Sequence, residues 1–245
     1  MAGPRCTVSP VPRQSPAKTT RRSDDSKRPV GRTSTTAGTK AASKADRRQQ
    51  LTIAALRLFS QHPYDDVSVD DIASEAGAAH GLVSYYFGGK RGVYLAALAM
   101  VQRDLDSLTQ PLPSDGDVTA QIKGMSRRHF EYFRAHPHLM IGMLHSGPVD
   151  PQTSQIAEAN QTSGAQALVR MLNLPENDQP AALEAALRGC MGFVNALTVH
   201  WLTHDQDLSI DRVVDLVFDV VTAAAASAVG ISTVETALGR PLAGR

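Results

Sequence analysis

Side chains suited to hydrogen bonding gather between residues 68 and 90 of this 245-residue sequence. The stretch combines serine hydroxyls, one imidazole, two phenols and one ammonium group, with small apolar residues among them. Groups of this kind hydrogen-bond to phosphate oxygens and to the edges of nucleic-acid bases. The candidate contact residues are Ser68, Ala79, His80, Leu82, Ser84, Tyr85, Tyr86 and Lys90.

His80 and its apolar neighbours offer the contacts that distinguish one base from another. An imidazole can donate a hydrogen bond to a guanine acceptor or to a phosphate, and Ala79 or Leu82 can touch a thymine methyl group. Tyr85 would face the nucleic-acid backbone, and Lys90 would add positive charge beside the free amides of a helix start.

Tyr86 has two interpretations. It faces the phosphates beside Tyr85, or it packs with Phe87 in the core of a small domain. For Phe87 the core position is favoured, because this side chain has no polar group to offer a phosphate.

The sequence contains few of the motifs that indicate catalysis or metal binding. The sequence has no glycine-rich phosphate loop, no nucleophile elbow and no carboxylate pair on a shared helix face. His200 and His204 lie one helical turn apart, and His136 and His138 form a second pair, but no cysteine joins either pair and no glutamate follows His200. We therefore expect no enzymatic activity, no metal and no cofactor.

A second group of side chains is soft, aromatic and mostly apolar, with a few polar members. Such a mixture is typical of a site for a small molecule, and the alternative is an ordinary core filled with adaptable methionines. The candidate ligand-binding residues are Met125, His129, Phe133, Met140, Met143, Leu144, Met171, Met191, Asn195 and Trp201.

The composition, with 42% hydrophobic and 20% charged residues, is that of a globular protein. Cys6 and Cys190 have no spacing that indicates a disulfide framework or a zinc site. No apolar run is long enough to span a bilayer, and the first residues lack an apolar secretory core. We expect a cytoplasmic protein without a membrane partner.

Charge is divided unevenly along the chain. Residues 1–48 hold 12 lysines and arginines against 3 acidic residues, whereas the rest holds 13 against 21. A basic arm on an acidic body favours contact with a polyanion, and Arg21, Arg22 and Arg28 are candidate DNA contacts. The alternative is a solvated tail without a partner.

The elements that must position these groups are helices. Apolar residues recur with helical spacing, while no alternating strand pattern and no repeat of fixed period occurs, which favours an all-α fold. The first helix is expected from about Ser43 to Pro63 and the second from Ser68 to Gly77. The further expected helices are 79–87, 90–108, 118–135, 137–145, 151–172, 180–204 and 210–229.

The second and third helices form a predicted helix-turn-helix. Ser68 and Asp71 have the spacing of a capping box. In this motif the serine oxygen accepts a hydrogen bond from a free amide of the first turn, and the carboxylate accepts one from the serine amide. Gly77 then supplies the positive φ angle of a tight turn.

The segment from Leu51 to Leu98 resembles the DNA-binding domain of the TetR family of regulators. The matching elements occur in the right order and spacing: Phe59, Tyr64, Ser68, Ile72-Ala73, Ala76-Gly77, Gly81, Tyr86-Phe87 and Lys90. Three departures concern single contacts: Ala79 replaces a capping hydroxyl, Ser84 replaces a tyrosine, and Asp70 would repel a phosphate.

The last predicted helix suggests self-association. Its apolar residues from Ile210 to Val221 point in nearly all directions around the helix, so both of its sides should be buried. The family resemblance implies a four-helix bundle made by two subunits, which would set two recognition helices about 34–36 Å apart on DNA.

Four regions follow from these observations. Residues 1–44 are a disordered basic arm, 45–92 a three-helix DNA-binding domain, 93–232 a helical ligand-binding and dimerisation domain, and 233–245 a loose tail. The expected protein is a homodimeric repressor that a small effector releases from a near-palindromic operator in double-stranded DNA. The alternatives are a ligand-independent DNA-binding regulator and a transcriptional activator.

Overall fold

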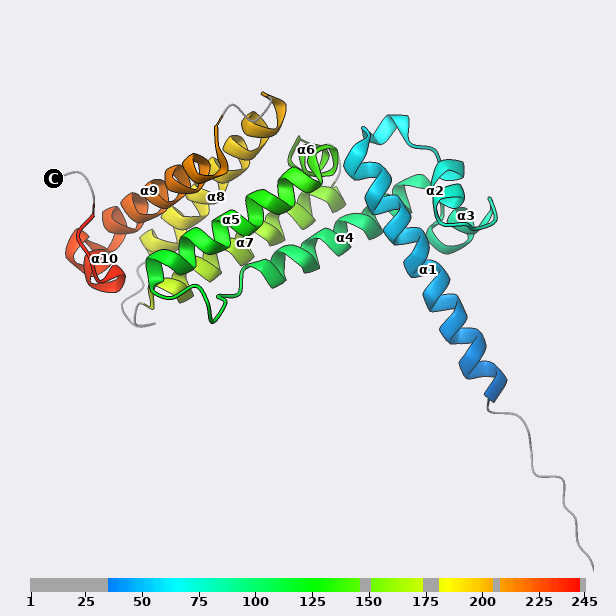
Figure 1. The fold of residues 1–245 in the computed structure, drawn as a ribbon, viewed down its shortest axis with the longest axis horizontal. Coiled ribbons are helices and arrows are strands. Elements are labelled where there is room, and N and C mark those ends of the chain that lie inside the picture. Colours follow the sequence, from blue (N-terminus) through cyan, green and yellow to red (C-terminus); the bar gives the residue numbers. More distant parts are fainter. Residues whose placement is uncertain (1–34, 146–150, 174–180, 205–207, 243–245) are drawn as a thin grey trace, which may run out of the picture. The chain divides into compact units, whose positions relative to one another are not determined.

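The computed structural model describes residues 35–145, 151–173, 181–204 and 208–242, with side chains from Lys44 onward. The described residues form α-helices and one short 3-10 helix, and no strand occurs among them (Figure 1). The elements are α1 (Thr35–Gln61), η1 (Tyr64–Asp66), α2 (Val69–Glu75), α3 (Leu82–Phe87), α4 (Lys90–Leu108), α5 (Val118–Ala135), α6 (Pro137–His145), α7 (Pro151–Leu172), α8 (Ala181–Thr203), α9 (Ile210–Val229) and α10 (Ile231–Leu238). The expected all-α fold is confirmed.

The chain divides into two units, residues 1–40 and residues 41–245. Every contact described here lies within the second unit. In that unit α1, α2 and α3 pack through small and branched apolar side chains. Leu51 and Phe59 of α1, Ile72 of α2 and Val83 of α3 are almost completely buried. Phe59 and Ile72 are among the positions that carry the family resemblance, and Val83 completes this core.

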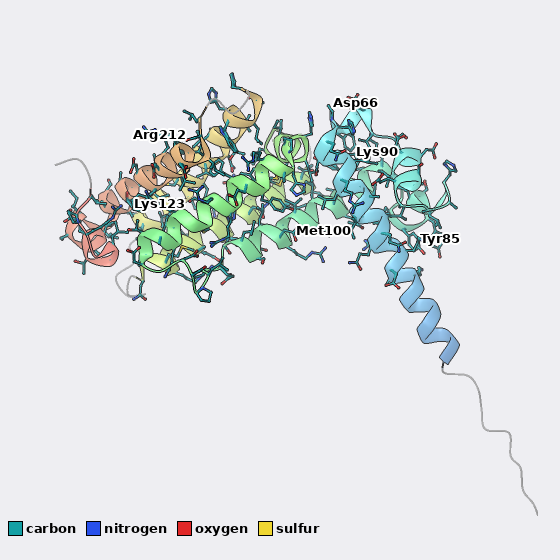
Figure 2. The ribbon with its side chains drawn as sticks, viewed as in Figure 1. Asp66, Tyr85, Lys90, Met100, Lys123 and Arg212 are labelled. Carbon is teal, nitrogen blue, oxygen red and sulfur yellow. The ribbon has the colours of Figure 1, made fainter. Side chains whose placement is uncertain are left out.

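A larger group of helices follows α4. Helices α5, α7, α8 and α9 lie side by side in Figure 1, and each packs against at least two of the others. An ion pair joins the polar side of α5 to α9: Nζ of Lys123 lies 2.6 Å from a carboxylate oxygen of Asp215. Figure 2 marks Lys123 on this helix. The buried residues of both helix groups belong to one continuous hydrophobic cluster.

Three helix ends differ from expectation. Helix α1 already begins at Thr35, inside the arm predicted as disordered, because alanine and lysine in this stretch favour helix. Helix α3 begins at Leu82 rather than Ala79, since the Leu82 amide bonds to the Ala79 carbonyl in a tight turn. The loose tail predicted from Thr233 is wrong for residues 233–238, which lie in α10 with Val234 and Leu238 buried.

A search of the described helices for one that is long and apolar enough to cross a bilayer finds none.

Candidate nucleic-acid interface and effector cavity

The start of α2 is fixed by the predicted capping box. The Asp71 amide donates to Oγ of Ser68 at 3.0 Å, and the Ser68 amide donates to the Asp71 carboxylate at 2.8 Å. The hydrogen bonds that the Ser68 hydroxyl and the Ser68 amide donate to the carboxylate lower the pKa of Asp71. The Ser68 hydroxyl is exposed, but it already donates to the same carboxylate. Its first role is therefore to hold the helix start.

His80 lies in the turn that precedes α3 and is held by α2. Its Nδ1 is 2.9 Å from Oδ1 of Asp70, and both side chains are largely exposed. Since a carboxylate accepts and does not donate, Nδ1 carries the proton of this bond and Nε2 is left to face outward. Asp70, which is expected to repel a phosphate, also orients the imidazole of His80.

The exposed edge of α3 is polar and aromatic. Ser84 and Tyr85 are exposed, and Tyr85 retains 67% of its accessible surface. Figure 2 marks the position of Tyr85. Tyr86 is half-buried and meets the Tyr85 ring edge-on, with centroids 4.9 Å apart. The ammonium group of Lys44 lies 5.3 Å from the centre of the Tyr85 ring. A cation and two phenols thus share one accessible edge.

Ala79 and Leu82 differ in exposure at the start of this edge. Ala79 is exposed, whereas Leu82 is half-buried and packs against the hydrophobic cluster. Phe87 is half-buried and also packs on that cluster, as the core interpretation predicts.

Lys90 stands at the first position of α4. Its Nζ lies 4.3 Å from the centre of the Tyr64 ring and donates to the carbonyl oxygen of Asp65 at 3.3 Å. The ammonium group therefore lies beside the helix start and is restrained there by η1, with its position marked in Figure 2.

A glycine-rich junction sets α3 against α4. Gly88 ends α3 with φ 74° and Gly89 has φ 123°, both in the region that favours glycine. A Cβ atom on Gly92 would lie only 1.8 Å from the carbonyl oxygen of Phe87. The close approach of the two helices therefore requires a residue without a side chain at position 92.

A cavity of about 90 Å³ lies inside the larger helix group. Residues of α4, α5, α6, α7, α8 and α9 form its walls. Helix α5 contributes several side chains, which include His129 and Phe133. The residues predicted to bind a ligand that line this cavity are Met125, His129, Phe133, Met140, Met143, Leu144, Met191 and Asn195.

Two residues of the predicted ligand set lie away from the cavity. Met171 is buried in the core, and Trp201 is buried with its Nε1 donating to the carbonyl oxygen of Leu208 at 2.8 Å. The Trp201 ring meets Phe130, which does line the cavity, with centroids 5.6 Å apart. Trp201 therefore packs against the cavity wall through Phe130 without lining the cavity itself.

Two polar side chains of the cavity, His129 and Asn160, present acceptor atoms without a hydrogen-bond partner within the described residues. His129 Nδ1 lies 2.9 Å from the Met125 carbonyl oxygen, so this nitrogen is the donor and Nε2 is the free nitrogen. Burial lowers the pKa of His129, which favours the neutral ring. Oδ1 of Asn160 is buried and has no hydrogen-bond partner within the described residues. Asp106 adds a carboxylate to the lining.

A hydrogen-bonded joint connects the cavity helix α5 with α1. Ser60 Oγ donates to the Leu56 carbonyl at 2.6 Å and lies 2.8 Å from Nδ1 of His136, which follows the last residue of α5. The His136 ring packs on Tyr132, whose hydroxyl donates to Asp104 of α4 at 2.9 Å. Burial lowers the pKa of His136 and, with the Asp104 bond, raises that of Tyr132.

The histidine pairs show no metal geometry in the part of the chain that the structure describes, where no group of three potential ligands converges. His200 and His204 stack with ring centres 4.2 Å apart, and Nδ1 of His204 bonds to the backbone of His200. His136 is engaged with Ser60 instead.

Several residues of these sites escaped sequence reasoning. Ser60 and Asn160 contribute through contacts between distant segments, for which the sequence carries no local signal. Asp70 was considered only as a group that repels a phosphate, and its contact with His80 was not foreseen. Gly92 carried one signal, since an isolated glycine inside a helix pattern often has a packing reason. The predicted contacts Arg21, Arg22 and Arg28 lie outside the described residues.

Comparison with known proteins points to the same segment. A family model described as "Bacterial regulatory proteins, tetR family" matches residues 51–97. The HTH-type transcriptional regulator BetI 1 of Chromohalobacter salexigens is 24% identical over 184 residues, which cover 71% of this chain and 88% of that protein. BetI of Brucella canis is 42% identical over 83 residues, which cover 34% of this chain and 37% of that protein.

Solved structures share the fold over most of the chain. A TetR-family transcriptional regulator from Streptomyces coelicolor superposes with a TM-score of 0.71 at 28% identity, covering 80% of this chain and 89% of that one. The regulator FadR from Bacillus subtilis, in complex with stearoyl-CoA, superposes with a TM-score of 0.54 at 16% identity, covering 75% and 98%.

Proposed function

This chain belongs to the TetR family of bacterial regulatory proteins, and from that premise we propose that it is a homodimeric repressor released from DNA by a small effector. The observation that carries the proposal is the exposed edge before and along α3, where an oriented imidazole, a hydroxyl and a phenol stand together. A helix of this kind inserts its first residues into the major groove. A regulator acts where its DNA lies, so the proposed compartment is the cytoplasm.

The proposed division of labour follows from the chemistry of each side chain. His80 Nε2 reads a base edge, Ser84 and Tyr85 hold phosphates, and Lys90 adds charge beside the α4 amides. In the basic arm, Arg21 and its neighbours strengthen binding through phosphate neutralisation, without reading sequence. A catalytic role is not proposed, because the relatives are transcription regulators.

The proposed dimer interface is the exposed side of α8 together with neighbouring α9. Ala185, Gly189, Gly192 and Ala196 are exposed at helical spacing on one face of α8, and the adjoining Phe193 keeps 36% of its accessible surface. Small side chains allow a second helix to approach closely, and an exposed phenylalanine gains by burial. Two copies joined there present two recognition helices to one duplex.

Release by an effector requires that the effector prefer one subunit geometry. A change from mostly bound to mostly free needs a preference of about 10⁴-fold between the two states. The cavity is suited to such a preference, since about 90 Å³ is smaller than the roughly 150 Å³ of an engineered cavity that holds benzene. A larger effector therefore has to move the flexible methionines of the wall, and with them α5 and α6.

The experiment is selection from a random DNA library by the purified full-length chain, followed by a reporter assay with the selected site. Enrichment of a near-palindrome and reporter activity that rises when the regulator is removed support the repressor. Reporter activity that falls on removal identifies an activator, and failure to enrich any sequence contradicts the proposal. Thermal stabilisation by a metabolite library, followed by loss of DNA binding, separates a sensor from a ligand-independent regulator.

A further inference from the structure

The charge of the cavity wall restricts what the cavity can hold. Among the described residues that line it, Asp106 carries the charged side chain and no lysine or arginine occurs. A carboxylate or phosphate in this space would lose its hydration without gaining a cation, which strongly disfavours binding of an anion in a poorly solvated interior. The bound stearoyl-CoA of the FadR structure is thus a poor guide to this chain, since its phosphates need cationic partners.

The hydrogen-bonding pattern of the wall restricts the ligand further. His129 gives its Nδ1 proton to the Met125 carbonyl, so Nε2 of the neutral ring offers a lone pair and has no partner in the described part of the chain. The Asn160 nitrogen reaches only a weak acceptor, the Met143 sulfur, at 3.6 Å, and its oxygen is buried without a partner. A buried acceptor left unpaired, such as Oδ1 of Asn160, is costly, and a ligand that donates to it removes that cost. A donor in the cavity can equally bond to the lone pair of Nε2.

Both restrictions point to the same chemical class. We propose that the effector is a small, mostly apolar molecule that carries an O–H or N–H donor and no negative charge, and that its donor bonds to Nε2 of His129 or to Oδ1 of Asn160. This inference rests on the proposed function, because it takes the cavity to be the effector site. The aromatic rings and methionines around these acceptors bind the apolar body.

Three probes of similar size test the need for a donor and the exclusion of negative charge separately. Phenol has an apolar ring and one O–H donor, toluene replaces the hydroxyl by a methyl group, and benzoate carries a negative charge. Titration calorimetry on the full-length protein, at a pH above the ordinary histidine pKa of 6.5, measures the three dissociation constants. We expect phenol to bind more tightly than benzoate, and the ratio of phenol to toluene affinity to depend on the acceptors.

Variants locate the donor contact. His129→Phe keeps a flat ring but removes Nε2, and Asn160→Leu keeps the volume but removes the oxygen. At least one of them is expected to lower the phenol-to-toluene affinity ratio by roughly 2- to 12-fold, the worth of one neutral hydrogen bond. Met171→Leu, which changes a buried residue outside the cavity, is the matched control and leaves the ratio unchanged.

The outcomes separate this inference from the proposed function. Benzoate binding as tightly as phenol, an unchanged ratio in both variants, or no binding of any probe overturns the inference. DNA selection by the same preparation tests the regulator independently, and phenol binding without release of the selected DNA would contradict release while leaving the donor preference standing. If one cavity variant fails to fold, the other variant and the three wild-type constants still decide.

Discussion

His80 is the residue whose contribution to DNA recognition is tested most directly. Its ring is oriented by Asp70 at 2.9 Å, so the substitution His80→Ala removes one preorganised contact without touching a buried group. We expect the affinity for the selected operator to fall roughly 5- to 100-fold, while non-specific affinity stays unchanged. Fluorescence anisotropy with operator and scrambled duplexes measures both, and His204→Ala, directly after the end of α8, is the control. An equal loss on both duplexes would mean that His80 contacts only phosphates.

The buried histidines make stability depend on pH. Burial lowers the folded-state pKa of His129 and His136, whereas the unfolded chain titrates near 6.5. Above 6.5 neither state takes up these protons; below it the unfolded state binds them first, so the free energy of unfolding falls as pH falls. The slope reaches up to about 1.4 kcal/mol per pH unit for each histidine.

Urea unfolding on both sides of the ordinary histidine pKa measures this slope. His129→Phe should reduce it, and Met171→Leu, which removes no titratable group, should not. A wild-type free energy of unfolding that stays level through this range would contradict the neutral, buried state of both rings.

At the residue scale, local chemistry was predictable and long-range contacts were not. The cap of Ser68 on Asp71 follows from a spacing of three residues. The partner of His80 is ten residues away across a turn, so its identity depended on the turn geometry. Trp201 was assigned to the ligand set by residue type, but it lies six residues beyond Asn195, nearly two helical turns further along α8.

Helix packing at the junction of α3 and α4 depends on Gly92. In an ordinary exposed helix position, alanine is about 1 kcal/mol more favourable than glycine. Here the added Cβ meets the Phe87 carbonyl, so Gly92→Ala should instead lower the free energy of unfolding by about 1–3 kcal/mol, as overpacking does. Chemical denaturation measures the change.

Ala99→Gly, at an exposed position of the same helix, is the control that isolates helix propensity. It should destabilise by about 1 kcal/mol through propensity alone. A gain in stability from Gly92→Ala would show that α3 and α4 do not approach as closely as described.

The joint between α5 and α1 is the second prediction at the scale of elements. Ser60 and His136 share a hydrogen bond of 2.8 Å, and Ser60 is buried. In a double-mutant cycle of Ser60→Ala and His136→Ala, we expect a coupling energy of about 0.5–1.5 kcal/mol in unfolding. Effects that add within about 0.3 kcal/mol would mean that the contact contributes nothing.

Whole helices were easier to predict than their ends. The bounds of α4, α5 and α9 agree with the expected ranges because proline, glycine and capping residues mark them in the sequence. The start of α3 was missed because Ala79 and Gly81 form a turn without a side-chain cap. Helix α10 was missed because residues 233–245 were predicted to be a loose tail, whereas Gly230 introduces a further helix that buries Val234.

At the scale of the molecule, dimerisation through α8 is open to a direct perturbation. Phe193→Glu places a charge at the centre of the proposed interface, where it would lose its hydration. We expect the dissociation constant of the dimer to rise on the order of tenfold or more in sedimentation experiments. Leu112→Glu, at a residue 46% exposed between α4 and α5, is the matched control and should remain dimeric. Unchanged sedimentation of Phe193→Glu would place the interface elsewhere.

Self-association was predicted from the apolar pattern of the helix that is now α9, together with the family resemblance. That helix buries Val213, Val217 and Val221 within its own chain, so its apolar character is largely satisfied there. The side left exposed is the small-residue face of α8.

Hydroxyl-radical footprinting of the full-length chain on its selected duplex tests the central claim most directly. Two recognition helices joined by a two-fold axis predict two symmetric protected patches whose centres lie about 10–10.5 base pairs apart. A single protected patch, or protection without two-fold symmetry, would contradict the dimeric regulator described here.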